Sequence, residues 1–223
     1  MSRNWIAASL LALVPALALA QAKPAAPPAS KPPAAAEDTK KPYVVGNVVD
    51  AAAISFVDLD GKTHTLKEWS GKTVILDFWS IECPVSKGYE ARLTALANDY
   101  AGKGVVFLAV DANSGEIADA SVAKIKDYVK KEKVPYTILL DKGNKVADRF
   151  DAQTTPHVFV IDDKGKLRYA GGVDDDENFK KTDPKTVKSF VREALDAVLA
   201  GKDPATTTTK PHGCAIKRAG AKS

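Results

Sequence analysis

A cysteine at the junction of a strand and a helix is the first candidate for chemistry in this sequence of 223 residues. Cys83 follows the nearly all-apolar run Thr73–Trp79, and Pro84 after it suits the first turn of a helix. Unpaired N–H groups and the helix dipole stabilise an anion at such a junction. We therefore expect a reactive Cys83 with a lowered thiol pKa, the alternative being a buried structural cysteine.

The second cysteine lies near the end of the chain. Cys214 stands beyond the last predicted helix, in a segment rich in Thr, Lys and Pro that is long enough, when extended, to reach Cys83. In one hypothesis, Cys214 resolves an oxidised Cys83 by forming an intramolecular disulfide. The alternatives are a permanent Cys83–Cys214 bond that pins the tail, and unrelated roles for the two thiols.

The pattern around Cys83 alternates between strands and helices. Apolar runs predict strands at 73–79, 105–110, 136–140, 157–161 and 167–170. Three- and four-residue spacing predicts helices at 84–100, 121–132 and 184–200, and Asp60-Gly61 predicts a β-hairpin within 44–66. The order of these elements predicts an α/β domain with a mixed central sheet and helices on both faces.

The two ends of the chain differ from this domain in composition. Residues 1–20 combine Arg3, an apolar run too short to span a bilayer, and the cleavage pattern Ala18-Leu19-Ala20, which together predict a signal peptide. We expect a disordered Pro/Ala/Lys-rich linker at 21–42, the folded domain at 43–200 and a flexible tail at 201–223. The mature protein is then periplasmic or secreted, with no stable membrane anchor after cleavage.

Composition excludes several classes of protein. Two cysteines are too few for a disulfide-stapled miniprotein or a cysteine-based zinc scaffold. The formal charge of +4 comes from basic residues in the two ends, whereas the predicted domain is slightly acidic. Because Lys and Arg do not cluster on the domain, we expect no nucleic-acid binding.

The segment around Cys83 resembles the active-site stretch of thioredoxin-fold proteins. Both have Asp-Phe-Trp, here Asp77-Phe78-Trp79, then three residues and a cysteine at the start of a helix. Thr155-Pro156 resembles the cis-proline loop that faces this cysteine. The opening hairpin is similar to that of the redoxin branch, the peroxiredoxin-like or AhpC/TSA family. The resemblance covers about residues 43–200 and implies a thioredoxin fold with an N-terminal β-hairpin extension.

Ser86 separates this sequence from the usual thioredoxin pattern. It replaces the second cysteine of Cys-x-x-Cys, and a serine cannot release a substrate from a mixed disulfide. The peroxiredoxin pattern is also incomplete, because Leu76 stands where that pattern has proline. The resemblance implies an exported oxidoreductase or antioxidant that acts through Cys83 on thiols, disulfides or peroxides, with an external reductant and no cofactor.

The resemblance also implies roles for the neighbours of Cys83. Asp77, if buried, exchanges a proton with the thiol; the alternative is a strand end exposed to water. A cis-Pro156 exposes backbone groups for substrate pairing. Trp79, Pro84 and Thr155 are the expected substrate contacts, with plain core packing as a nearly equal alternative for Trp79.

Two other functions remain open from the sequence. Thiolate and imidazole ligands suit copper and zinc, so Cys83, Cys214, His157 and His212 could form a soft-metal carrier. Lys87, however, occupies the position of the second cysteine in the Cys-x-x-x-Cys pair of copper-delivery proteins that share this fold. A thioredoxin-like module that binds partners without catalysis is the third interpretation.

Overall fold

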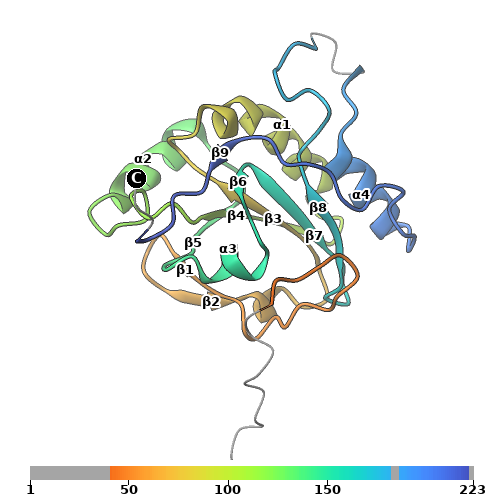
Figure 1. Ribbon diagram of the computed structural model, residues 1–223, viewed down its shortest axis with the longest axis horizontal. Coiled ribbons are helices and arrows are strands. Elements are labelled where there is room, and N and C mark those ends of the chain that lie inside the picture. The colour runs from red at the N-terminus through yellow and green to blue at the C-terminus, as the bar shows by residue number, and fades with distance from the viewer. Residues whose placement is uncertain (1–40, 182–185, 221–223) are drawn as a thin grey trace, which may run out of the picture. The chain divides into compact units, whose positions relative to one another are not determined.

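The alternating strand and helix patterns produce one mixed sheet with helices on both faces. The computed structural model describes residues 41–181 and 186–220 (Figure 1). The predicted signal peptide at 1–20 and almost all of the predicted linker at 21–42 lie outside the described residues. None of the helices in the described part of the chain has the length and apolarity that crossing a bilayer requires.

Seven strands form the central sheet, in the order β2-β1-β5-β4-β3-β7-β8. Their bounds are β1 Ser55–Asp58, β2 Thr63–Thr65, β3 Thr73–Trp79, β4 Val105–Asp111, β5 Thr137–Leu140, β7 His157–Ile161 and β8 Leu167–Gly171. β3 pairs in parallel with β4 and antiparallel with β7, so the sheet is mixed, as predicted. Every residue of β3 is buried, which explains why its sequence is almost entirely apolar.

Helices cover both faces of this sheet. They are the 3-10 helix η1 Leu66–Trp69 and the α-helices α1 Pro84–Tyr100, α2 Val122–Glu132, α3 Lys145–Arg149 and α4 Phe190–Leu199. α1, α2 and α4 pack on the face that carries Ile75, whereas α3 and η1 pack on the opposite face with Leu76. α4 begins at Phe190 rather than at 184, because the Ser189 side chain caps it by accepting the Arg192 N–H.

The N-terminal β-hairpin is confirmed and is shorter than predicted. In it, Phe56 of β1 lies opposite His64 of β2. The Asp58 carboxylate accepts the N–H groups of Asp60 and Lys62, and Gly61 adopts a positive φ of 87° that glycine tolerates. β1 also pairs antiparallel with β5, so the hairpin extends one edge of the sheet.

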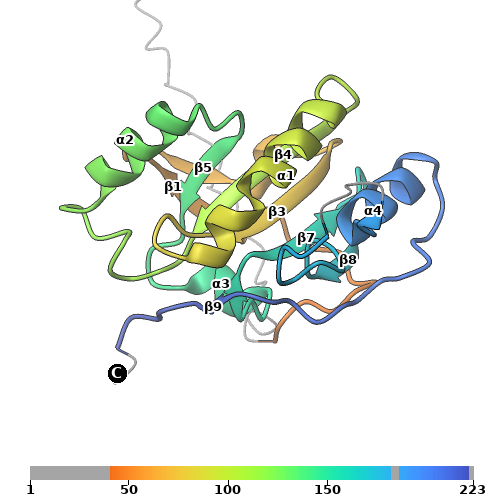
Figure 2. The same cartoon turned by 90° about the horizontal axis from the view of Figure 1, so that it is seen from above.

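The C-terminal segment follows the surface of the domain. We call residues 207–219 the strap. Its Thr207 and Thr209 exchange main-chain hydrogen bonds with Ala170 of β8. Further along, β9 (Cys214–Ala215) pairs antiparallel with β6 (Thr154–Thr155). Figures 1 and 2 show this dark-blue segment running along the outside of the domain toward the C-terminus. Ile216 is 6% exposed and belongs to the apolar cluster on the α3 side. This anchored course differs from the flexible tail that the sequence led us to expect.

Glycines explain how closely the strap approaches the domain. A Cβ on Gly171 would lie 2.3 Å from the Thr209 Oγ1, and a Cβ on Gly213 would lie 2.2 Å from the Thr155 carbonyl oxygen. The main chains therefore meet where side chains are absent. Short bridges of this kind have no periodicity, so the sequence pattern does not reveal them.

Candidate active site

Cys83 occupies the N-cap position of α1, where the sequence analysis placed it. Its backbone is extended, with φ −80° and ψ 115°, and Pro84 begins the helix. The Cys83 Sγ accepts a hydrogen bond from the Ser86 N–H at 3.4 Å, one of the unpaired donors at the helix start. This donor stabilises negative charge on the sulfur.

The loop before β7 faces the sulfur of Cys83. The Thr155–Pro156 peptide bond is cis, as the resemblance implied. The Cys83 thiol donates a hydrogen bond to the Thr155 carbonyl oxygen at 3.0 Å. Thr155 is buried, whereas Pro84 is exposed at the rim of this site. Cys83 is itself only 3% exposed, so little of its surface is open while the strap is in place.

The strap brings the second thiol to the first. In the pairing of β6 with β9, Cys214 lies directly opposite Thr155, the residue whose carbonyl oxygen accepts the Cys83 thiol. The thiols of Cys83 and Cys214 interact with each other and are not joined by a disulfide. The sequence showed only that the tail is long enough for Cys214 to reach Cys83, whereas the structure places the two residues side by side.

The two thiols differ in acidity. Burial by itself raises the pKa of the Cys83 thiol, but hydrogen bonding with Cys214, Thr155 and the Ser86 amide outweighs it, and the pKa is lowered. Burial and then the neighbouring Cys83 raise the pKa of the Cys214 thiol. Cys83 is therefore the thiol that ionises first, in the direction that the sequence analysis expected.

Asp77 lies on β3 and is fully buried. Neither of its carboxylate oxygens has a hydrogen-bond partner at ordinary distance among the described residues. Burial raises the pKa of Asp77 well above its usual value, the nearby His157 amide lowers it in part, and the charge of Cys83 raises it further. An electrostatically linked carboxyl and thiol in a dry environment are suited to proton exchange.

Trp79 lies in the apolar core of the domain. Its side chain is 1% exposed, and its ring packs against Tyr128 at a centroid distance of 5.9 Å. This burial favours the core-packing alternative for Trp79. The indole supports the end of β3 from the α2 side, because the β-strand alternation directs position 79 to the same face as Ile75.

The two histidines near the cysteines have other neighbours. His157 accepts the Gln153 N–H at 3.2 Å and its ring lies against that of Phe159 in a tilted contact, and burial lowers its pKa to about 4. His212 lies 3.5 Å from a carboxylate oxygen of Glu177. Within the described residues, His, Cys, Asp and Glu side chains form no group of three or more that could hold a metal ion.

Sequence reasoning missed a serine and a glutamate that hold the Cys83 loop. The Ser80 Oγ accepts the Cys83 N–H at 3.0 Å and donates to Glu116 at 2.6 Å. Glu116 lies in a polar loop far from Ser80 in the chain. The charge and position of Glu116 do not distinguish it from a solvated surface residue.

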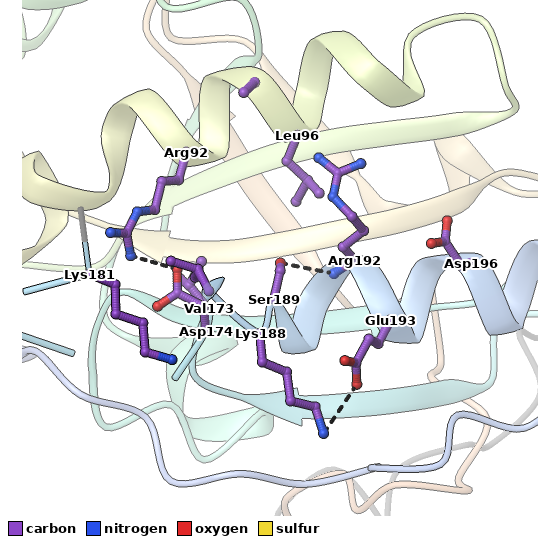
Figure 3. Close-up of a pocket in the computed structure, with 12 residues that line it drawn as sticks. Arg92, Leu96, Val173, Asp174, Lys181, Lys188, Ser189, Arg192, Glu193 and Asp196 are labelled. Atoms are coloured by element: carbon purple, nitrogen blue, oxygen red, sulfur yellow. Dashed lines mark hydrogen bonds and ion pairs between the residues drawn. The ribbon is translucent and has the colours of Figure 1, made fainter. Parts of the chain in front are cut away.

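A cavity of about 510 Å³ lies elsewhere in the molecule, between α1 and α4 (Figure 3). Its charged rim is largely paired, since Arg92 contacts Asp174 at 2.8 Å and Lys188 contacts Glu193 at 3.5 Å. Neither cysteine lines this cavity. The thiol site is thus a narrow contact between strap, loop and helix, and not a large pocket.

Three kinds of comparison with known proteins follow from this site and fold, and the first is with curated relatives. Thiol-disulfide oxidoreductase ResA of Bacillus cereus is 34% identical over 110 residues, which are 49% of this chain and 60% of that protein. ResA of Halalkalibacterium halodurans is 30% identical over 117 residues, 52% of this chain and 63% of that protein. The chain therefore spans about three fifths of the length of these curated relatives.

Solved structures match a larger share of the chain. A hypothetical protein of Sinorhizobium meliloti has a TM-score of 0.69 at 30% identity, over 80% of this chain and 97% of that one. An uncharacterised conserved protein of Geobacillus kaustophilus has a TM-score of 0.68 at 27% identity, over 80% and 95%. Residues 46–170, more than half of this chain, match the AhpC/TSA family. The chain belongs to the AhpC/TSA family, the redoxin branch of the thioredoxin fold, as its sequence motifs predicted.

Proposed function

We propose that the protein is a thiol-disulfide oxidoreductase whose redox pair consists of Cys83 and Cys214. The observation that carries this proposal is the β6–β9 pairing, which sets Cys214 opposite the carbonyl that accepts the Cys83 thiol. The strap then supplies the thiol that Ser86 does not. The thiol-disulfide activity named for the Bacillus relatives supports the reaction class.

The chemistry takes two exchange steps. The Cys83 thiolate attacks one sulfur of a substrate disulfide, forms a mixed disulfide and releases the other sulfur as a thiolate. Cys214 then loses its proton, attacks the Cys83 sulfur, closes the Cys83–Cys214 disulfide and releases the second substrate thiolate. The protein is oxidised by two electrons and the substrate is reduced by two. An external thiol reductant returns the pair to the dithiol.

Asp77 is the group we assign to proton transfer in the second step. Burial raises the pKa of the Asp77 carboxyl well above its usual value, and the charge of Cys83 raises it further, so the carboxyl and the thiol titrate together. An anionic Asp77 can accept the proton that Cys214 must lose before attack. Thr155, cis-Pro156 and Pro84 form the face on which the substrate sulfur approaches.

A small peroxide is a second candidate oxidant, and the burial of Cys83 favours it. The thiol of a residue that is 3% exposed is easier for a small molecule to reach than for a folded protein. The thiolate attacks the peroxide, one oxygen stays on Cys83 as a sulfenic acid, and an alcohol leaves. Condensation with the Cys214 thiol releases water and gives the same disulfide.

Mass spectrometry and counting of alkylatable thiols test the proposed Cys83–Cys214 redox pair. We expect the reduced wild-type protein to have two alkylatable thiols, and none after brief treatment with a soluble disulfide or peroxide. The oxidised chain stays monomeric, and mild reductant restores both thiols. The Cys214→Ala control instead keeps a mixed disulfide after treatment with the soluble disulfide, and a sulfenic acid on Cys83 after treatment with peroxide. Two thiols that persist in the oxidised wild type would refute the proposed pair, and a bond that resists mild reductant would indicate a static link.

We also propose that the chain is exported and acts in the periplasm or outside the cell. The proposal rests on the pattern of residues 1–20 and on cleavage after Ala20. Protein recovered from the exported fraction of the native host should begin at Gln21. An intact mass that includes residues 1–20 would contradict export by cleavage, and Ala20→Arg should block processing.

A further inference from the structure

A buried polar corner at the end of β4 touches both segments that carry a cysteine. We define the polar corner as Asp111, Asn113 and Glu116, whose exposed fractions are 0%, 3% and 4%. Burial of polar side chains costs free energy unless their hydrogen bonds are made. The partners of this corner therefore indicate what it is built to hold.

Glu116 holds the loop before Cys83. One carboxylate oxygen accepts the Ser80 hydroxyl at 2.6 Å, and the other accepts the Ile81 N–H at 2.9 Å. The Ser80 Oγ in turn accepts the N–H groups of Glu82 and Cys83, at 3.1 and 3.0 Å. The main chain at the reactive cysteine is thereby tied to the polar corner through one hydroxyl.

Asn113 holds the strap, three residues beyond Cys214. Its Oδ1 accepts the Lys217 N–H at 2.9 Å, and the Ser114 N–H donates to the Lys217 carbonyl oxygen at 2.9 Å. The strap is thus bound by the same loop that binds the Cys83 segment. Cys214 lies between this anchor and the anchor of Thr209 on β8.

Asp111 sets the orientation of the Asn113 amide. Its Oδ1 accepts both the Asn113 main-chain N–H at 2.9 Å and the Nδ2 group at 3.2 Å. With Nδ2 turned to Asp111, the Oδ1 of Asn113 faces Lys217 and can only accept. An aspartate at 113 would lack this donor and would face another carboxyl group.

We propose that Asn113 is a positioning residue of the redox pair, which holds Cys214 in register with Cys83. Asn113 fixes the strap to the polar corner, and Glu116 of the same corner fixes the Cys83 loop. The segments that carry the two thiols are therefore held by the same group of buried residues. The inference rests on the proposed function, because it concerns the closing of the Cys83–Cys214 disulfide. Asn113 touches neither thiol, so it acts only through the strap.

The hydrogen bond can be removed from the exposed side of the contact. Lys217→Pro deletes the N–H that Asn113 accepts, and Lys217→Ala keeps this N–H while removing the side chain that lies 3.8 Å from Glu82. Lys217 is exposed on the strap, so neither change disturbs the domain core. Asn113→Leu removes the same bond from the buried side.

The probe is an aromatic disulfide whose released thiolate absorbs visible light, mixed with an excess of full-length protein. The first thiolate reports attack by Cys83, and the second reports resolution by Cys214. We expect Lys217→Pro and Asn113→Leu to slow the second phase about tenfold, because the strap loses an anchor and the effective concentration of Cys214 falls. The first phase is not slowed, and Lys217→Ala behaves as wild type.

The outcomes separate this inference from the proposed function. If the wild type releases a single thiolate, Cys214 does not resolve and the proposed function fails. If the wild type releases two and Lys217→Pro resolves as fast as Lys217→Ala, Asn113 does not position the strap. A Lys217→Ala protein as slow as Lys217→Pro would also overturn the inference, since it would assign the effect to the side chain. If Asn113→Leu folds poorly, the comparison of Lys217→Pro with Lys217→Ala decides whether Asn113 positions the strap.

Discussion

Replacing Cys214 should abolish most of the disulfide-reductase turnover, and a new cysteine at position 86 should restore it. We expect Cys214→Ala to lower steady-state disulfide reduction at least about 100-fold, because an intramolecular thiol is replaced by dilute external thiol. Ser86 is fully buried, and its N–H lies 3.4 Å from the Cys83 Sγ. Ser86→Cys in the Cys214→Ala background therefore rebuilds a local redox pair and should recover activity to within about tenfold of wild type.

A matched control separates the new thiol from the loss of serine. Ser86→Ala in the Cys214→Ala background changes the same buried side chain without adding sulfur and should recover nothing. The measurement is steady-state reduction of a soluble disulfide with an external thiol as reductant. Cys214→Ala with wild-type turnover would remove the strap cysteine from the mechanism. If Ser86→Cys forms a disulfide with Cys83 and still recovers no activity, release from Cys83 is not the step that Cys214 serves.

The buried carboxyl of Asp77 should make the protein less stable as pH rises. Its pKa in the folded protein is raised well above its ordinary value, mainly by burial, so the folded state holds a proton that the unfolded state has released. The free energy of unfolding therefore falls as pH rises above the ordinary value, by up to about 1.4 kcal/mol per pH unit, until the folded carboxyl ionises. Asp77→Asn removes this slope.

Urea unfolding of the reduced wild type and Asp77→Asn at several pH values checks this. We expect Asp77→Asn to gain stability relative to wild type with each step toward alkaline pH. The contributions of His157 and Asp111, with pKa values of about 4 and about 8, are common to both proteins and cancel in the difference. The same variant should slow resolution by Cys214 about 10- to 100-fold, because it removes the proton acceptor.

Asp162→Asn is the control, because the pKa of Asp162 is shifted in the opposite direction to that of Asp77. Burial opposes ionisation of Asp162, but the hydrogen bond from Arg168 and those from backbone amides lower its pKa. Its charged form therefore stabilises the fold above the ordinary pKa, and this contribution is lost as pH falls through the lowered value. Asp162→Asn should lose stability at neutral pH without the alkaline gain. A pH-independent difference between wild type and Asp77→Asn would contradict the assignment of Asp77.

Local chemistry made much of this protein predictable. The run Thr73–Trp79 predicted a central buried strand, and Cys83 followed by Pro84 predicted a thiol at the start of a helix, because strand burial and helix capping depend on neighbouring residues. The Asp60-Gly61 turn predicted the hairpin for the same reason. Asp77 and the Thr155-Pro156 pair were found through the motif that they share with the family.

Contacts between distant parts of the chain could be decided only by the folded structure. The composition of residues 201–220 gave no sign of a strap, because its anchors are isolated hydrogen bonds to distant residues and close main-chain approaches at Gly171 and Gly213. The rim and the core were nearly equal alternatives for Trp79 in the sequence, and its packing against Tyr128 of α2 became visible only in the folded structure. Glu116 and Asn113 carry no signal in the sequence, since their importance comes from burial beside Ser80 and Lys217. Periodicity reports which face of an element is apolar, whereas the meeting of Cys83 with Cys214 depends on where loops end in space.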